Sequence, residues 1–298
     1  MGLSDLIRDV HAAKAKGTYL QPYLLESLSK SEPKHVGPDM WMSPSVISEF
    51  CPRAWSIAWR AGIPFADEHG PDNRWWMDLG TAMHKVLQEM WLGPAGLIKG
   101  GWRCPACGVV QGYDPDDLTK IRSHGEDHMQ KVTPRSAITM PDRCPQCGFR
   151  PNWRATFAYI EPLLYNLDDR ICGWSDGIIN WPSSIQPDEL VDFKVPLSLR
   201  WVKDAPSEAH VSQLSLYMDM ANIPRGRIMY LSRSEKHLAD ASMEHPFTLD
   251  PQIVKREKEK VRAFRKAAKS PESSLPACPY GGARRFGPCD CTRLESAL

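Results

Sequence analysis

The stretch that decides the fold is residues 171–197, ICGWSDGIINWPSSIQPDELVDFKVPL. Two runs in it, ICGWSDGIINW and ELVDFKVPL, are rich in β-branched and aromatic residues and predict two strands. WPSSIQPD between them supplies turn residues, so we expect a hairpin. Residues two apart on a strand point to the same side, which places Asp192 and Lys194 on one face. Asp176 of the first strand can then reach Asp192 across the hairpin.

Two carboxylates and an amine on one hairpin are suited to metal-assisted chemistry. Asp176 and Asp192 would form an oxygen-rich site of the kind that magnesium or manganese prefers, and His84 could add a nitrogen ligand from a nearby helix. Such an ion lowers the pKa of a bound water, while Lys194 can orient that water or stabilise charge in the transition state. These residues predict hydrolysis of phosphodiester bonds. The alternatives are a core histidine at position 84 and a surface ion pair between Asp192 and Lys194.

The rest of the chain predicts an α/β protein with a mixed, mainly antiparallel sheet flanked by helices. Ser43 begins a helix that carries Cys51, and residues 79–92 form a helix with an apolar stripe from Leu79 to Met90, closed by the turn residues 93–102. Further expected elements are a strand at 154–164, a helix at 208–222, a strand at 226–233 and a basic helix at 251–270.

We expect five segments along the chain. They are an N-terminal helical segment (1–42), the first helices of the core (43–100), an inserted zinc ribbon (101–150), the main core (151–270) and a C-terminal cysteine segment (271–298).

Nine cysteines in a chain without a recognisable export signal favour metal binding over disulfides. Two CPxCG knuckles, with Cys104 and Cys107 in the first and Cys144 and Cys147 in the second, predict a four-cysteine zinc site. Four protein ligands leave no open position, so this zinc would be structural. A rival site would combine the first knuckle with His124 and His128.

The other cysteines divide into one group of four and one single residue. Cys51 lies early in the chain, and Cys278, Cys289 and Cys291 lie near its end. Together they could bind a metal, which would join the first helix to the C-terminal segment. We expect Cys172 to be a small buried apolar residue.

Four short motifs occur in a recognisable order: GxxxH (Gly80 to His84), GxxD (Gly173 to Asp176), DxK (Asp192 to Lys194) and QxxxY (Gln213 to Tyr217). This order resembles the RecB branch of the PD-(D/E)XK nuclease superfamily. With Cys51 ahead of the motifs and three cysteines after them, the chain resembles the iron–sulfur exonucleases of that branch, namely the CRISPR-associated Cas-four family and its phage relatives. The resemblance covers residues 43–291, interrupted by residues 101–150.

The resemblance implies a PD-(D/E)XK nuclease core and a role for each motif residue. His84, Asp176, Asp192 and the Phe193 carbonyl would be metal ligands, and Lys194 would be the catalytic lysine. Gln213 and Tyr217 would position the site or the DNA backbone, and Glu161 stands where such enzymes often carry an acid. Cys51, Cys278, Cys289 and Cys291 would hold a 4Fe-4S cluster, with a second zinc as the competing assignment. Two departures are Ser175 in place of the family's proline and the spacing of Cys278 from Cys289.

Composition says less about the protein's partners and location than the motifs say about its chemistry. The formal net charge is +1, so any DNA-binding surface must be local, and we expect no membrane span and a cytoplasmic location in a bacterium or a phage-infected host. The expected partner is DNA with single strands or frayed ends, contacted by Trp174, Trp201, the basic helix, Arg284 and Arg285. We expect a DNA exonuclease that acts in replication, recombination or repair, with a protein partner from one of these processes or a second copy of the chain. The alternatives are a DNA-binding adaptor that has lost catalysis and a nuclease subunit of CRISPR spacer acquisition with an integrase partner.

Overall fold

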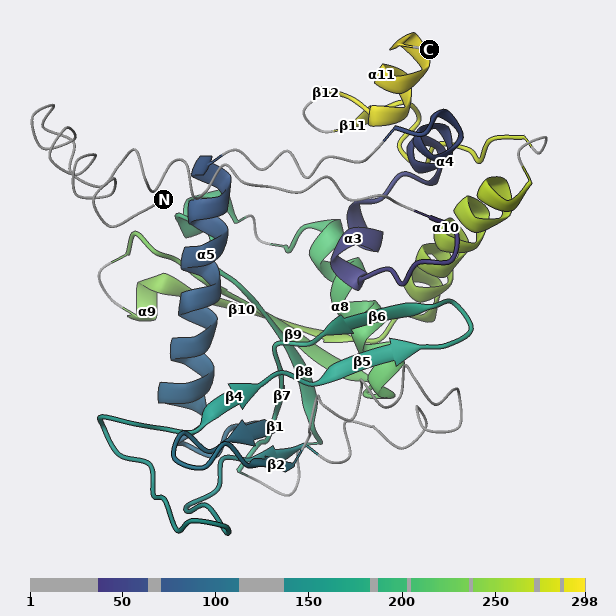
Figure 1. Cartoon of the computed structure of the whole chain (residues 1–298). Coiled ribbons are helices and arrows are strands. Elements are labelled where there is room, and N and C mark those ends of the chain that lie inside the picture. Colours follow the sequence, from purple (N-terminus) through teal and green to yellow (C-terminus); the bar gives the residue numbers. More distant parts are fainter. Residues whose placement is uncertain are drawn as a thin grey trace, which may run out of the picture.

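The computed structural model describes residues 37–63, 71–112, 137–182, 187–202, 205–235, 238–270, 274–284 and 287–297. The predictions for residues 1–36, His124, His128 and Arg285 lie outside these residues. The chain forms a mixed α/β structure in which helices flank a central mixed sheet, as predicted (Figure 1). None of the described helices combines the length and apolar character needed to cross a bilayer.

The described strands are β1 (Ile98–Arg103), β2 (Val110–Gly112), β3 (Ile138–Thr139), β4 (Ala158–Ile160), β5 (Leu163–Asn166), β6 (Ile171–Trp174), β7 (Gly177–Ile179), β8 (Glu189–Lys194), β9 (Arg225–Leu231), β10 (Ser242–Thr248), β11 (Ala283–Arg284) and β12 (Gly287–Pro288). The described helices are α3 (Pro44–Glu49), α4 (Pro52–Ala61), α5 (Pro71–Lys85), the π-helix η1 (Val86–Leu92), the 3-10 helix η3 (Leu199–Trp201), α8 (Glu208–Ala221), α9 (Leu238–Ala241), α10 (Pro251–Lys269) and α11 (Asp290–Ala297).

The central sheet has the order β10-β9-β8-β7-β1-β2, and β3 and β4 also pair with β1. The hairpin expected from residues 171–197 is confirmed in part: β7 and β8 pair antiparallel, with Gly177 opposite Val191. The first expected strand is divided into β6 and β7, and Asp176 lies in the break instead of on a strand. β9 lies parallel to β8, and the other pairs of this sheet are antiparallel. β5 and β6 form a separate hairpin.

Successive residues of β8 pack against different layers because strand side chains alternate between faces. Leu190 belongs to a buried cluster with Leu214 and Tyr217 of α8. Val191 and Phe193 belong to a cluster on the other face, which contains Leu87 of η1. Asp192 and Lys194 therefore share the face that α8 covers.

The helix predicted at 43–62 is two helices, so the prediction of one continuous helix is wrong. Ser43 does cap α3, since its side chain accepts a hydrogen bond from the Val46 amide. Pro52 lacks an amide hydrogen and disfavours helical backbone at the preceding residue, and Cys51 accordingly adopts φ −106° and ψ 110°. The break places Cys51 at the N-cap of α4.

The helix predicted at 79–92 starts earlier, at Pro71, and changes to a π-helix at Val86. The π-type hydrogen bond from the Gly93 amide to the Gln88 carbonyl is 2.9 Å long. Leu87 is buried, whereas Met90 is 59% exposed, so Met90 does not belong to the buried stripe. The wider helical turn shifts the residues after Val86 away from a simple 3.6-residue period.

Residues 93–102 were expected to be a turn, but they contain most of β1, and this strand pairs with β7 and three further strands. Gly100 belongs in this strand because a Cβ there would collide with the Tyr159 ring. The Tyr159 hydroxyl donates a 2.8 Å hydrogen bond to the Lys99 carbonyl. The core sheet thus extends to Arg103, the residue before the first knuckle.

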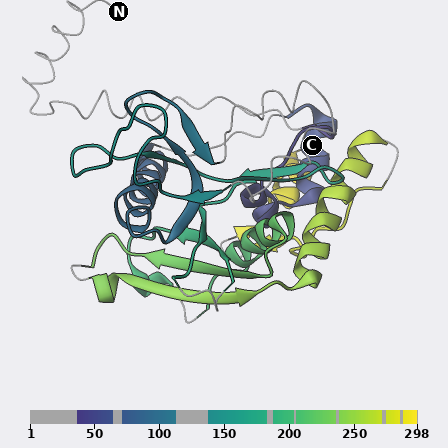
Figure 2. The same ribbon diagram turned by 90° about the horizontal axis from the view of Figure 1, so that it is seen from below.

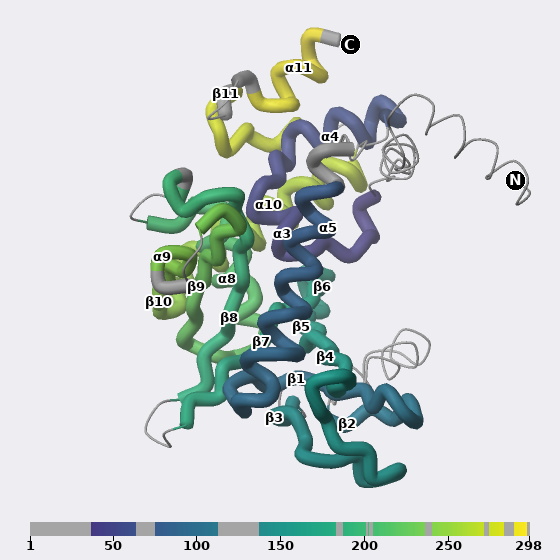
Figure 3. The backbone as a smooth tube through the Cα atoms, turned by 90° about the vertical axis from the view of Figure 1, so that its left-hand side faces the viewer, coloured from purple at the N-terminus to yellow at the C-terminus, as the bar shows by residue number. Residues whose placement is uncertain are grey.

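The remaining predicted elements agree with the structure except at one point. The helix at 208–222, the strand at 226–233 and the basic helix at 251–270 correspond to α8, β9 and α10. The single strand expected at 154–164 is divided into β4 and β5 on either side of Glu161 and Pro162. Figure 2 shows α5 and α10 at opposite ends of the sheet. Figure 3 shows β1–β4 far from α4 and α11.

Candidate functional site

An imidazole and two carboxylates gather where α5 meets the broken strands. His84 lies near the end of α5, Glu161 lies between β4 and β5, and Asp176 lies between β6 and β7. One ligand atom from each lies within 4.8 Å of the other two, and His84 Nδ1 is 3.4 Å from Asp176 Oδ1. One nitrogen and two carboxylate oxygens form a donor set that could hold a divalent metal ion.

The hairpin fixes the position of Asp176. The Phe193 amide on β8 donates a 2.6 Å hydrogen bond to Asp176 Oδ2. On the other side of the loop, the Ser175 amide donates a 2.9 Å bond to the Pro162 carbonyl. These two bonds hold the Asp176 carboxylate beside His84, whose ring also packs edge-on against Phe193 with centroids 5.8 Å apart. The role predicted for the Phe193 carbonyl stays a prediction.

Gln88 is a site residue that the sequence interpretation missed. Gln88 belongs to η1, and its side chain is buried. Gln88 Nε2 donates a 3.0 Å bond to Glu161 Oε1 and a 2.8 Å bond to the Asp176 carbonyl. Gln88 therefore connects the two acidic segments. The sequence did offer one signal for this role: Gln88 is a polar residue that directly follows Leu87, an apolar residue of the predicted helical stripe.

Lys194 lies between Asp192 and α8. Its Nζ is 2.9 Å from Asp192 Oδ2 and donates a 2.9 Å hydrogen bond to Gln213 Oε1. Asp192 is 3% exposed and lies outside the three-residue group of His84, Glu161 and Asp176. The structure therefore places one predicted ligand, Asp192, beside the predicted catalytic lysine and brings Glu161 together with His84 and Asp176.

The carboxylates of Asp192, Glu161 and Asp176 lie close enough for their charges to affect the pKa values of the site. Burial raises the pKa of Asp192 to about 6; the Lys194 ammonium opposes this shift, and the charge of Asp176 adds to it. Burial also raises the pKa of Glu161, and Asp176 adds to that shift. Burial lowers the pKa of the His84 imidazole, but the hydrogen bond and charge of Asp176 outweigh burial and raise it overall. This concentration of negative charge would be relieved by a bound cation.

Tyr217 and Gly173 show why two of the short motifs meet. A Cβ at Gly173 would lie 2.9 Å from the Tyr217 hydroxyl and 2.8 Å from Pro44 Cδ, so only glycine allows this approach. Burial raises the pKa of Tyr217, and the charges of Asp192 and Asp176 raise it further. Tyr217 is therefore a neutral hydrogen-bonding group beside the carboxylates.

A partly buried pair next to Lys194, His210 and Tyr230, was also missed by the sequence interpretation. His210 Nδ1 and the Tyr230 hydroxyl are 2.7 Å apart, and Tyr230 is the β9 partner of Lys194. Burial lowers the pKa of His210 to about 4, and the charge of Lys194 contributes to the shift. His210 is thus neutral at pH 7 and adds no positive charge beside the lysine.

A cavity of about 550 Å³ opens beside the three-residue group. Its lining includes the acids Glu161 and Asp176, the cations Lys85 and Arg103, and the aromatic residue Trp174. Trp174 is 44% exposed. The second tryptophan singled out from the sequence, Trp201, lies in η3.

Several cations of α10 are engaged within the protein. Arg262 Nε is 2.6 Å from Asp169 Oδ1, and Lys258 Nζ is 2.7 Å from Asp219 Oδ2. Lys260 pairs with the buried Glu257. These ion pairs attach α10 to the rest of the core and compete with its predicted contact to phosphates.

The two CPxCG knuckles adopt the same conformation. The Gly108 amide donates to the Cys104 carbonyl and the Gly148 amide donates to the Cys144 carbonyl, each at 2.9 Å. The two glycines have φ +76° and +75°, a conformation that glycine adopts readily. The four sulfurs, from Cys104, Cys107, Cys144 and Cys147, lie within 4.8 Å of one another and could hold a metal.

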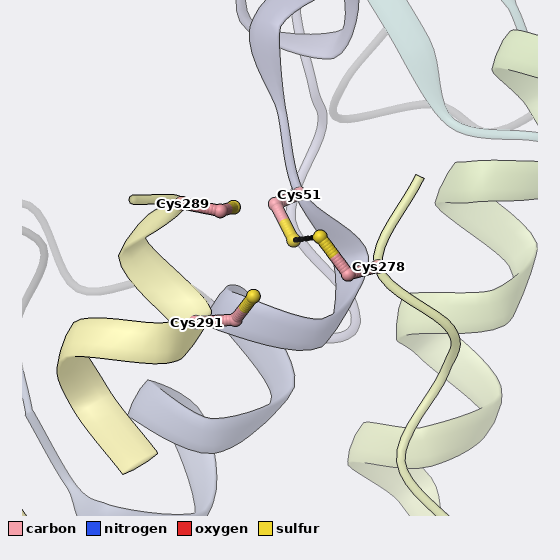
Figure 4. Close-up of side chains that lie close together, drawn as sticks. All are labelled: Cys51, Cys278, Cys289 and Cys291. Carbon is pink, nitrogen blue, oxygen red and sulfur yellow. Dashed lines mark hydrogen bonds between the residues drawn. The ribbon is translucent and has the colours of Figure 1, made fainter. Parts of the chain in front are cut away.

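The remaining four-cysteine group joins the two ends of the described chain. Cys51 occupies the N-cap position of α4, Cys278 precedes β11, and Cys289 and Cys291 lie at the start of α11. Figure 4 shows their side chains gathered between α4 and α11, and Cys51 Sγ is 3.8 Å from Cys278 Sγ. All four sulfurs lie within 4.8 Å of one another and could hold a metal.

Each group has one thiol with a lowered pKa and others with a raised pKa. Burial raises the pKa of Cys291 to about 11. In the knuckles, the Val109 amide favours the Cys107 thiolate, but burial and the neighbouring thiols outweigh that hydrogen bond and raise the pKa of Cys107. The pKa of Cys278 is lowered to about 7, because backbone amides of Gly282 and Tyr280 outweigh the opposing effect of burial. The pKa of Cys144 is also lowered to about 7 against burial, by backbone amides that include that of Cys147. Cys172 lies on β6, is half-buried and belongs to neither group.

Comparisons with known proteins add little to this description. No protein-family model matches the chain, and a search of curated proteins found no match. Among solved structures, a crystal structure of a protein called SSO0001 is similar at 14% identity, with a TM-score of 0.36. The match covers 87% of this chain and 89% of that chain. A likeness this weak indicates neither a shared fold nor a shared function.

Proposed function

We propose that this protein is a metal-dependent deoxyribonuclease with a PD-(D/E)XK-type core. The observation that carries the proposal is the meeting of His84, Glu161 and Asp176 beside a hairpin that presents Asp192 and Lys194. Magnesium or manganese held by these groups would polarise a phosphodiester and make a bound water more acidic. The resemblance of the four motifs to the RecB branch supports DNA as the substrate.

Lys194 is the residue suited to stabilising charge on the phosphate. Its ammonium is held by Asp192 on one side and Gln213 on the other, so its position is restricted before substrate arrives. A pre-positioned cation stabilises the transition state without a further cost of reorganisation. His210 stays neutral behind it, which leaves the positive charge concentrated on Lys194.

Gln88 and Phe193 are suited to positioning the carboxylates. Gln88 bonds to Glu161 and to the backbone of Asp176, while the Phe193 amide bonds to the Asp176 carboxylate. Such bonds fix the orientation of carboxylate ligands and raise the affinity for a metal. An exonuclease acting on single strands or frayed ends is the activity that fits the resemblance best.

For the knuckles we propose a structural zinc. Tetrahedral bonds of about 2.3 Å require thiolates about 3.8 Å apart. The distances of 3.6 Å between Cys104 and Cys147 and between Cys107 and Cys144 fit that requirement. All four cysteines would be ligands, so this ion would take no part in hydrolysis.

For the second cysteine group we propose a 4Fe-4S cluster, in agreement with the family that the chain resembles. Four convergent thiolates from two distant parts of the chain support a shared metal centre. The 3.8 Å distance between Cys51 and Cys278 also suits a single zinc. Iron, zinc and sulfide contents of the purified protein distinguish the two assignments.

The nuclease proposal is tested with end-labelled single-stranded DNA and magnesium or manganese. We expect the wild-type protein to shorten the DNA and the variants Asp176→Asn and Lys194→Ala to lose this activity. Asp188→Asn is the matched control, because Asp188 pairs with Lys99 outside the site. Wild-type binding without cleavage would indicate an adaptor instead. Equal cleavage by all variants would rule out the proposed site.

A further inference from the structure

The two CPxCG knuckles form a repeat in which each is preceded by arginine, RCPACG at 103–108 and RCPQCG at 143–148. Both arginines are exposed, but they have different surroundings. Arg103 lines the cavity beside the carboxylates, whereas Arg143 is not among its lining residues. One arginine of the repeat is therefore placed to contact a molecule bound at the site.

The backbone at Arg103 is held from three directions. Arg103 is the last residue of β1, where it lies opposite Val110 of β2 on one side and Ala158 of β4 on the other. The next residue, Cys104, is a knuckle cysteine whose amide donates a 2.8 Å bond to the Val109 carbonyl. A metal bound by the knuckles would thus anchor the strand end from which the Arg103 side chain reaches the cavity.

The cavity offers chemistry that matches a nucleotide. Arg103 and Lys85 supply positive charge for a phosphate, and Glu161 and Asp176 form the side that would carry a metal. Trp174 offers a half-exposed aromatic face for an unpaired base. A volume of about 550 Å³ falls in the range of small-ligand sites.

We infer that Arg103 and Trp174 form a nucleotide-binding subsite next to the cleavage site, with Arg103 on a backbone phosphate and Trp174 stacked on a base. The inference rests on the proposed nuclease function and adds a role for the cysteine-bearing segment. That segment supplies a substrate-binding residue to the catalytic cavity in addition to any stabilising role.

The test measures binding separately from cleavage. The full-length protein, carrying its own metals, is titrated into a fluorescein-labelled oligothymidylate with calcium in place of magnesium, and anisotropy gives the Kd. We expect Arg103→Gln to raise the Kd about tenfold, and to reduce the slope of log K against log salt by about 0.7, the value for one phosphate contact on a single strand. Arg143→Gln, the matched control from the second knuckle, should stay within about twofold of wild type.

Trp174 is tested in the same assay. We expect Trp174→Ala to raise the Kd about tenfold and Trp174→Tyr to restore most of the affinity, because tyrosine can still stack. Trp153→Ala is the control, since Trp153 is 83% exposed and does not line the cavity. Melting temperature and zinc content of each variant identify any loss of fold.

The outcomes separate this inference from the proposed function. If the wild-type protein binds and cleaves DNA but Arg103→Gln and Arg143→Gln have equal effects, the subsite is wrong and the nuclease proposal stands. The same holds if Trp174→Ala binds as tightly as wild type. If the wild-type protein neither binds nor cleaves DNA, both proposals fail.

Discussion

Gln213 on α8 accepts a 2.9 Å hydrogen bond from Lys194 Nζ on β8. The bond joins the DxK and QxxxY motifs, which are separated in sequence but meet across one face of the sheet. Lys194 also contacts Asp192, so its ammonium has two partners within the protein. Such a restrained ammonium is a good candidate for transition-state stabilisation.

Replacing Lys194 by methionine removes the charge and keeps most of the side-chain volume. We expect kcat on single-stranded DNA to fall about 100- to 1000-fold while the Kd for DNA changes little, because the lost interaction acts in the transition state. Single-turnover cleavage and anisotropy measure the two quantities. Lys99→Met is the control, since Lys99 has a comparable ion pair with Asp188. Similar rates for the two variants would show that Lys194 has no special role.

Asp192→Asn should separate stability from activity. Burial raises the Asp192 pKa from 3.8 to about 6, so the native state holds a proton that the unfolded state releases between these values. The stability from that proton is present below about pH 4 and is lost as pH rises through 6. In chelator at pH 8, we therefore expect Asp192→Asn to be more stable than wild type by about 1–3 kcal/mol, although it is inactive.

Urea unfolding at several pH values measures this difference. The advantage of Asp192→Asn should shrink steadily from pH 8 to pH 4. The exposed Asp188→Asn serves as the control and should show no comparable trend. A variant that is less stable than wild type at pH 8 would mean that the ion pair with Lys194 outweighs the cost of burying Asp192.

Gln88→Ala should weaken metal binding and leave the chemistry largely intact. Its amide orients Glu161 and the Asp176 loop, so we expect about 10- to 100-fold more magnesium or manganese to be needed for half-maximal cleavage. At saturating metal, kcat should approach the wild-type value. Gln252→Ala, at the exposed start of α10, is the control. An unchanged metal requirement together with a lower kcat would contradict this role.

Cys278→Ser should remove the metal of the second cysteine group and weaken the junction between α4 and α11. We expect a fall in Tm of at least about 5 °C, because metal-binding free energy contributes to the stability of the fold. Cys172→Ser is the matched control, since Cys172 belongs to neither group. Metal and acid-labile sulfide analysis is done on all three proteins.

The metal analysis has its own clear outcomes. Iron and sulfide that disappear only in Cys278→Ser would support the 4Fe-4S assignment. Two equivalents of zinc without iron would identify a second zinc site and rule out the cluster. Equal metal contents in Cys278→Ser and wild type would show that this group does not bind the metal.

Local chemistry explains which parts of the site could be predicted. The hairpin follows from two strand-forming runs and a turn-rich segment, and strand alternation alone placed Asp192 and Lys194 on one face. The repeated CPxCG spacing indicated one four-cysteine group. These features depend on neighbours in sequence, so no knowledge of distant contacts was needed.

Other features depend on contacts that sequence order does not reveal. The π-helical turn brings Gln88 to Glu161, and Tyr159 packs against the glycine-rich segment that forms β1. A carboxylate oxygen of Glu161 lies beside His84. All three contacts form only when the sheet is assembled. The break at Pro52, by contrast, is local and follows from the sequence, because proline disfavours helical backbone at the preceding residue.

By itself, then, the sequence determined the hairpin, its charged face and the grouping of cysteines by spacing. Only the tertiary structure decided which acids surround His84, that Asp192 contacts Lys194 instead, and that Arg103 but not Arg143 reaches the cavity. The physical reason is that side-chain direction along one strand is set by the backbone. The distance between side chains on different elements is set by how those elements pack, which depends on the whole core.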